Sequence, residues 1–274
     1  MNVTFYVPTL NSEKTIEECL KSIFAKEVKP KDVMIIDGNS TDNTIKIANK
    51  LKVKVIKQEQ DGLANARTLA LKNCKTKFIA SIDSDCILEK NWLENVMKNF
   101  NKNTAGVCGK LIEKNVNTIY DKWRAYHLKQ DWGNKKIINP KFLFGSNSVF
   151  RVESLKKIGS YREMYKTNYE DVDISMKLKQ NGFNIIYEPS ATCYHLKKDD
   201  LLSIIATARK WSFYSYSIPN SFIRILMRLL IYNPYLFVNF LVKDLLKLKF
   251  NFIHITLLGF FYNQIFDIGY YLKK

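Results

Sequence analysis

Two aspartates separated by one serine, Asp83-Ser84-Asp85, are the residues of this sequence whose types and spacing point most directly to chemistry. They follow the apolar run Phe78–Ile82, which predicts a buried strand whose carboxyl end carries both acids. Two carboxylates this close repel each other when ionised unless a cation lies beside them. Mg²⁺ or Mn²⁺ held by one or two carboxylates and substrate phosphates meets that need, and a solvated Asp-Ser-Asp turn is the alternative.

A second polar segment, residues 37–42, follows the strand expected at 32–37. The Asp37 carboxylate at such a strand end can accept hydrogen bonds from a nucleobase or a ribose hydroxyl. Gly38 lets a backbone approach closely, and Ser40 or Asp42 can cap the next helix. Capping alone explains part of this segment, and the two roles are compatible.

Gly62 directly precedes a helix expected at 63–73, and Arg67 lies near the start of that helix. Arg67 can reach a ligand phosphate or pair with an acid. Gly62 again permits close approach of a backbone.

Glu170 and Asp171 begin a helix expected at 171–180. The helix dipole favours acids at this end, which is a sufficient structural explanation, and the functional alternative is that one carboxylate acts as a general base. His195 ends the last strand candidate; it is either structural or offers a neutral nitrogen to a metal.

Strand and helix patterns alternate over the first hundred residues, which predicts an α/β fold with a mostly parallel, Rossmann-like sheet flanked by helices on both faces. The region from about 105 to 196 is more mixed. The expected strands are 3–7, 32–37, 53–56, 78–82, 107–112, 147–150 and 184–187, and the first helix, with its apolar face at Ile16, Leu20, Ile23 and Phe24, is capped by Asn11 or Ser12.

Composition restricts the partners of the chain. Its 274 residues are 46% hydrophobic, enough for one large domain with an appendage. The net charge of +17 favours anionic partners, but the lysines are scattered, so nucleic acid is not expected. Five cysteines without CxxC spacing indicate reduced thiols in the cytoplasm, and the N-terminus reads as a strand instead of a signal peptide.

From Leu201 onward the composition changes to long apolar stretches with nine Lys or Arg and two acids. Residues 222–242 carry Arg224, Arg228 and Pro234, which makes them a poor membrane span. Residues 250–272 are long enough to span but contain His254, Asn263, Gln264 and Asp267. Basic amphipathic helices lying on an anionic membrane surface fit this segment best, and a helical cap or a dimer contact is the alternative.

Taken together, these motifs resemble those of a family 2 glycosyltransferase with the GT-A fold. The resemblance covers residues 1–197 and rests on order and spacing. Its carriers are Pro8-Thr9-Leu10-Asn11, Asp37-Gly38 with Ser40 and Asp42, Gly62 with Ala66-Arg67, Asp83-Ser84-Asp85, Gly145-Ser146-Asn147 with Arg151, and Glu170-Asp171.

The resemblance implies a role for each matching position. Asp171 would deprotonate the acceptor hydroxyl and Glu170 would position the acceptor. Asp85 and His195, with Asp83, would hold Mn²⁺ or Mg²⁺. The nucleotide-sugar site, for a UDP- or GDP-sugar, would comprise Pro8, Thr9, Asn11, Asp37, Gly38, Ser40, Gly62, Arg67, Asp83, Ser84 and Asn147.

We therefore expect a catalytic domain over 1–200, with a nucleotide-binding half (1–100) and an acceptor-binding half (101–200), followed by membrane-associated helices over 201–274. The expected reaction is inverting, metal-dependent transfer of a single sugar to an acceptor hydroxyl, possible acceptors including a lipid-linked glycan at the inner membrane face. The Gln-x-x-Arg-Trp element of processive members is not matched at 206–211, where Arg209 and Trp211 are separated by Lys210. A nucleotide-sugar pyrophosphorylase and an inactive membrane scaffold are the alternatives.

Overall fold

The computed structural model describes residues 1–25, 29–213 and 221–273 of a chain that forms two compact units. The first unit comprises Met1–Lys114 and Gln130–Lys197, and the second comprises Asn115–Lys129 and Lys198–Lys274. The last crossing between the units falls near the boundary expected at residue 200. The excursion of residues 115–129 into the second unit was not expected from the sequence.

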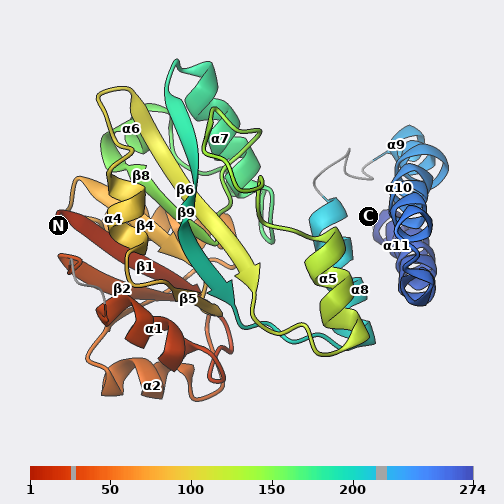
Figure 1. Ribbon diagram of the computed structural model, residues 1–274, viewed down its shortest axis with the longest axis horizontal. Helices are drawn as coiled ribbons and strands as arrows, with labels where there is room; N and C mark the ends of the chain where they lie inside the picture. Colours follow the sequence, from red (N-terminus) through yellow and green to blue (C-terminus); the bar gives the residue numbers. More distant parts are fainter. Residues whose placement is uncertain (26–28, 214–220, 274) are drawn as a thin grey trace. The chain divides into compact units, whose positions relative to one another are not determined.

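A nine-stranded sheet organises the first unit (Figure 1). The strand order is β3-β2-β1-β4-β8-β6-β9-β5, with β7 paired to β9. Because β8 is antiparallel to both β4 and β6, the strands β1, β2, β3, β4, β6 and β9 all run in one direction, which confirms the mostly parallel sheet. The strands are β1 (Val3–Thr9), β2 (Asp32–Asp37), β3 (Lys54–Lys57), β4 (Phe78–Ile82), β5 (Cys86–Leu88), β6 (Thr104–Glu113), β7 (Ile137–Ile138), β8 (Asn147–Arg151) and β9 (Asn184–His195).

Alternation along β1 explains how both faces of the sheet are covered. Val3, Phe5 and Val7 lie in the main hydrophobic core with α1 and α4, whereas Tyr6 on the other face bonds Arg67 of α3. The helix α1 starts after Thr15, one turn later than the cap expected at Asn11 or Ser12, because Ser12 uses its carbonyl to receive the first amides. The helices of this unit are α1 (Ile16–Phe24), α2 (Thr44–Lys50), α3 (Leu63–Asn73), α4 (Trp92–Met97), α6 (Val152–Lys157) and α7 (Glu170–Gln180).

The second unit is helical. One stretch in it, Phe222–Leu246, is long and apolar enough to cross a membrane by length and composition, with an 18-residue window of mean hydropathy 1.6. The expectation that residues 222–242 are a poor span stays a prediction; within the stretch, Arg228 is paired with Asp267, and Pro234 occupies the first turn of a helix, where it is tolerated. The elements are α5 (Ile119–His127), α8 (Leu201–Phe213), α9 (Phe222–Met227), the π-helical turn η1 (Arg228–Tyr232), α10 (Asn233–Leu246), η2 (Phe250–Phe252) and α11 (Ile253–Leu272).

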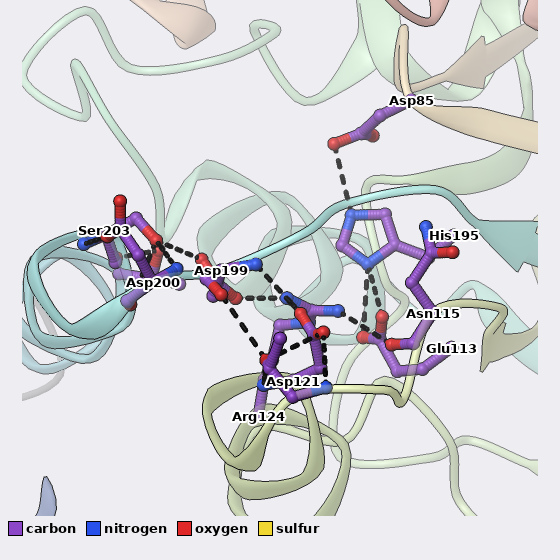
Figure 2. A network of polar contacts seen from close by, with 11 residues as sticks. Asp85, Glu113, Asn115, Asp121, Arg124, His195, Asp199, Asp200 and Ser203 are labelled. Carbon is purple, nitrogen blue, oxygen red and sulfur yellow. Dashed lines mark hydrogen bonds and ion pairs between the residues drawn. The ribbon is translucent and has the colours of Figure 1, made fainter.

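A buried ion pair fixes α5 to the start of α8. Arg124, which is 2% exposed, donates to the Asp199 carboxylate, and the Asp199 amide donates to Asp121 across 2.8 Å (Figure 2). Trp123 packs with Ile204 of α8 in the small core of this unit. These contacts explain why residues 115–129 belong with the C-terminal helices.

Arg209 on α8 is 3% exposed and pairs with Asp267 of α11, which Arg228 also contacts. The Arg209 guanidinium is therefore used in an ion pair inside the helical unit.

Candidate active site

Five polar residues end strands that run in the same direction, so they meet at one edge of the sheet. Thr9 ends β1 opposite Asp37 at the end of β2, and Glu113 ends β6 opposite His195 at the end of β9. Asp83 directly follows β4. The carboxyl edge of parallel strands is where open α/β sheets bind ligands, so this edge is the candidate active site.

The Asp37 carboxylate is held by the loop that follows it. It is 1% exposed and accepts hydrogen bonds from the amides of Asn39 and Ser40, both at 3.1 Å. The Thr9 hydroxyl lies 3.5 Å away. A Cβ at Gly38 would come within 3.3 Å of the Thr9 carbonyl, so the glycine serves the close passage of the two loops.

Asn11 ties the loop after β1 to the loop after β2. Its amide donates to the Ser40 hydroxyl at 2.9 Å, and its side-chain oxygen accepts from the Thr41 amide at 2.8 Å. Its backbone has φ 50°, a left-handed conformation that asparagine tolerates. Pro8 lies in β1 opposite Ile36. Nucleotide contacts by these residues remain predictions.

Arg67 contacts several residues of the candidate site. It is 2% exposed, and its Nε donates to Glu170 Oε1 at 3.0 Å. Its Nη1 contacts the Tyr6 hydroxyl, the Ser81 hydroxyl and the Gly145 carbonyl, and its Nη2 lies 3.8 Å from Asp83. Of the two roles that the sequence allowed for Arg67, the structure shows pairing with acids.

Glu170 is buried at the start of α7, and its expected role in positioning the acceptor stays a prediction. Its side chain is 3% exposed and faces Arg67. Burial raises the pKa of Glu170 to about 7, although Arg67 acts in the opposite direction. Glu170 therefore holds Arg67 in place.

Asp171 next to it is the better candidate for the base. Its Oδ2 accepts from the Gly145 amide at 3.1 Å and its Oδ1 from the Val172 amide at 2.8 Å. Burial raises the pKa of Asp171, partly offset by Arg67. The preceding Tyr169 has φ 76°, a strained conformation for an aromatic residue of the kind found at functional sites.

The Asp83-Ser84-Asp85 turn joins β4 to β5. The Asp83 side chain is 36% exposed, and loss of hydration raises its pKa to about 6 despite Arg67 beside it. The Ser84 hydroxyl lies 2.8 Å from the Ser12 hydroxyl, so Ser84 is bonded within the protein.

Asp85 and His195 face each other because Cys86 of β5 pairs with His195 of β9. His195 Nε2 lies 3.1 Å from Asp85 Oδ2, and His195 Nδ1 lies 2.9 Å from Glu113 Oε2 (Figure 2). Burial disfavours the imidazolium, but the two carboxylates outweigh it and raise the pKa of His195 to about 10. Burial acts to raise the pKa of Asp85, yet His195 lowers it overall.

These residues fit a divalent cation that substrate also ligates. Over residues 1–25, 29–213 and 221–273 there is no group of three or more His, Cys, Asp or Glu able to hold a metal. Asp85 and His195 are adjacent, however, and Mg²⁺-type sites commonly use one or two protein ligands plus phosphate oxygens. Glu113 supplies the carboxylate behind the histidine that usually accompanies a ligating imidazole.

Two other expected site residues make close contacts within the protein. Asn147 is 0% exposed, and its side-chain oxygen accepts from the Gly109 amide at 2.8 Å, while its contact with the donor stays a prediction. Gly62 has φ 114°, and a Cβ there would lie 3.1 Å from Lys166 Cα. The backbone that approaches Gly62 closely is therefore that of Lys166 in the same chain.

Sequence reasoning missed Glu113, Tyr6 and Ser81. A signal for Glu113 existed, because an acid directly follows the expected strand 107–112 and so reaches the same sheet edge. Tyr6 and Ser81 lie inside strands and gave no signal; they matter because Arg67 is buried between them.

The first unit therefore combines a mostly parallel α/β sheet with a carboxylate turn at its carboxyl edge. The model of the family described as "Glycosyl transferase family 2" matches residues 4–159. The chain belongs to glycosyl transferase family 2.

The comparisons with individual proteins are more distant. The chain is 25% identical over 224 residues to poly-beta-1,6-N-acetyl-D-glucosamine synthase of Staphylococcus aureus (strain COL), an alignment covering 77% of this chain and 53% of that one. The chain thus spans about half the length of the curated relatives that it matches.

Two solved structures share the fold. Mannosyltransferase PcManGT from Pyrobaculum calidifontis, in complex with GDP-Man and Mn²⁺, has a TM-score of 0.61 and 20% identity over 78% of this chain and 61% of that one. S. aureus TarS 1-349, in complex with UDP-GlcNAc, has a TM-score of 0.60 and 21% identity over 82% and 67%. These similarities confirm the GT-A type of α/β fold.

Proposed function

We propose that this protein is an inverting, metal-dependent glycosyltransferase that moves a single sugar from a nucleoside-diphosphate sugar to an acceptor hydroxyl. The observation that carries the proposal is the link through Arg67, which contacts Asp83 of the acidic turn and Glu170, the neighbour of Asp171. Family membership supports the reaction class.

In this mechanism the Asp171 carboxylate takes the proton of the attacking hydroxyl. Its two amide hydrogen bonds orient it, and the buried Arg67–Glu170 pair holds the start of α7. Asp85 and His195 would hold Mn²⁺ or Mg²⁺, which neutralises the charge that develops on a leaving diphosphate. Attack from the face opposite the leaving group inverts the anomeric carbon.

The donor would be a UDP- or GDP-sugar bound along Pro8, Thr9, Asn11, Asp37 and Ser40. Structures with this fold carry GDP-Man with Mn²⁺ and UDP-GlcNAc, which supports a nucleotide sugar and a divalent cation.

We also propose a lipid-linked acceptor at the cytoplasmic face of the membrane. The support is the apolar stretch Phe222–Leu246, in which an 18-residue window is only 17% buried, and the exposure of Leu230 and Ile265, both 70%. Neither nucleic acid nor a polymeric product is part of this proposal.

The proposal is tested by measuring product release from a panel of UDP- and GDP-sugars with Mn²⁺ or EDTA, in the presence of lipid-linked acceptors. Metal-dependent release of nucleoside diphosphate with sugar transfer supports it. Release of pyrophosphate from a sugar phosphate and a nucleoside triphosphate would indicate a pyrophosphorylase. If no donor raises the melting temperature in a thermal-shift assay, with or without Mn²⁺, the result would indicate a scaffold.

A further inference from the structure

The helical second unit contains a cavity of about 210 Å³. Aromatic residues of α5, α8, α10 and α11 line it, among them Trp123, Trp211, Phe240 and Phe260. None of the residues lining it is Asp, Glu, Lys or Arg. A dry engineered cavity of about 150 Å³ binds benzene, so this one has room for a ring or a short run of lipid chain.

Three of the residues that line the cavity each carry a buried acceptor atom that lacks a donor within the described part of the chain. These atoms are Nδ1 of His127, whose side chain is 0% exposed, Oδ1 of Asn233, which is 1% exposed, and Oδ1 of Asn263. The Asn233 amide nitrogen is used in bonds to Gln264 and Asp267, which assigns its oxygen. A buried polar atom without a partner is costly, so the wall favours a ligand with donor groups.

Neighbouring hydrogen bonds determine that His127 Nδ1 is an acceptor. Trp123 Nε1 donates to the Thr256 hydroxyl at 3.1 Å, and that hydroxyl donates to Asp244 Oδ2 at 2.8 Å. His127 Nε2 lies 2.7 Å from Asp244 Oδ1, so Nε2 carries the proton. Burial lowers the pKa of His127 although Asp244 acts in the opposite direction, which leaves Nδ1 with its lone pair.

Gly259 opens the cavity from the side of α11. It lines the cavity, and a Cβ built there meets no atom within 4 Å. Glycine inside a helix costs about 1 kcal/mol relative to alanine. The missing side chain therefore leaves space that a ligand can use.

We propose that this cavity binds the hydroxyl-bearing end of an uncharged lipid. Its aromatic wall takes the apolar chain, its acceptors take the hydroxyl protons, and the absence of lining charge disfavours a phosphate group. Positions of α10 and α11 outside the cavity wall are apolar and exposed, such as Val238 at 51% and Phe261 at 56%, which offers a lipid an apolar surface beside the site. The inference does not depend on the proposed transfer reaction.

The test uses the purified full chain in detergent and three probes with the same chain: a dibrominated long-chain alcohol, its methyl ether and the corresponding carboxylate. Bromine quenches tryptophan on contact, and Trp123 and Trp211 line the cavity. We expect saturable quenching with the alcohol at an apparent Kd about three- to tenfold below that of the ether, which lacks the donor, and of the carboxylate.

Gly259→Leu fills the cavity and should remove the saturable quenching. Gly269→Leu is the matched control, since Gly269 lies on the same helix, has open space at its Cβ and does not line the cavity. Asn263→Leu should make alcohol and ether equal. Equal quenching of the wild type and Gly259→Leu would overturn the inference by showing partitioning onto the outer surface, and so would tighter binding of the carboxylate or no quenching at all.

Discussion

Arg67 Nε lies 3.0 Å from Glu170 Oε1, which joins the start of α3 to the start of α7 across 103 residues of sequence. Neither side chain is more than 3% exposed, so the pair is made in the interior and fixes what surrounds it. Asp83 lies 3.8 Å from Arg67 Nη2, and Asp171 is the residue after Glu170. Loss of one partner of a buried pair leaves an uncompensated charge, so substitution of either Arg67 or Glu170 should destabilise this arrangement.

Asp171→Asn should abolish sugar transfer while leaving nucleotide affinity nearly unchanged. The amide keeps the shape of the side chain but cannot take a proton, and a general base contributes about 10²–10⁴-fold to the rate. Turnover and the Kd of the nucleoside diphosphate are measured on the same preparation. Asp173→Asn on the same helix, where Asp173 pairs with Lys177, is the control expected to retain turnover. Wild-type turnover in Asp171→Asn would mean that the base is another residue.

Asp85→Ala should weaken nucleotide binding in the presence of Mn²⁺ and leave binding in EDTA almost unchanged, because the carboxylate contributes through the metal. Isothermal titration with UDP and GDP in both conditions measures the difference. Asp61→Ala, an exposed acid before α3, is the control. An equal loss of affinity with and without metal would show that Asp85 acts on the fold or the nucleotide directly.

Arg67→Met should lower the free energy of unfolding by about 3–5 kcal/mol, since it strands the Glu170 carboxyl in the interior. Urea unfolding followed by fluorescence measures it. Arg162→Met is the control, because the Arg162 side chain is 55% exposed and its pair with Asp173 is worth less than about 1 kcal/mol. A change in Arg67→Met as small as that of the control would contradict the interior role of Arg67.

As the pH is lowered, the rate of transfer should begin to fall at a higher pH than expected for an aspartate with an ordinary pKa. Burial raises the pKa of Asp171 above its usual 3.8, and protonation removes the base, so kcat/KM decreases as pH falls through the raised value. Glu170, with a pKa of about 7, and Asp83, with a pKa of about 6, also titrate above the usual range of a carboxyl group. The pKa of Asp85 is lowered from 3.8, so that residue stays ionised above this pH. A pH–rate profile that remains flat down to pH 3.8 would contradict this account.

Flotation with anionic vesicles should be lost when charge is placed on the exposed apolar helices. Leu230→Glu combined with Ile265→Glu should reduce partitioning about tenfold. Ile138→Glu, 64% exposed in the first unit, is the control. Truncation near residue 200 is a poorer test, because Trp123 packs with residues beyond it. Unchanged flotation of the double variant would remove the membrane proposal.

Local patterns predicted much of the fold. The bounds of β2, β4 and α3 agree with the sequence expectation because apolar runs and Gly62 mark them clearly. The excursion of residues 115–129 was missed, since α5 carries a buried Arg124 whose partner, Asp199, is 75 residues away. An amphipathic pattern does not reveal which unit a helix joins.

The same distinction applies to the candidate site. Asp37, Asp83, Asp85 and His195 were predictable because each follows an apolar run at the sheet edge. The burial of Glu170 and Asn147 was not, because exposure depends on long-range partners such as Arg67 and Gly109. Residue type and spacing identified the region of the candidate site, whereas the burial of each side chain depends on packing that the sequence does not show.

Anomalous scattering from Mn²⁺ in crystals grown with a non-transferable nucleotide sugar tests the central proposal most directly. We predict a manganese peak bonded to Asp85 and His195 and to the diphosphate, with the Asp171 carboxylate facing the anomeric carbon on the side away from the diphosphate. A nucleotide bound away from the carboxyl edge of the sheet, or an anomeric carbon with Asp171 on the same side as the diphosphate, would contradict it.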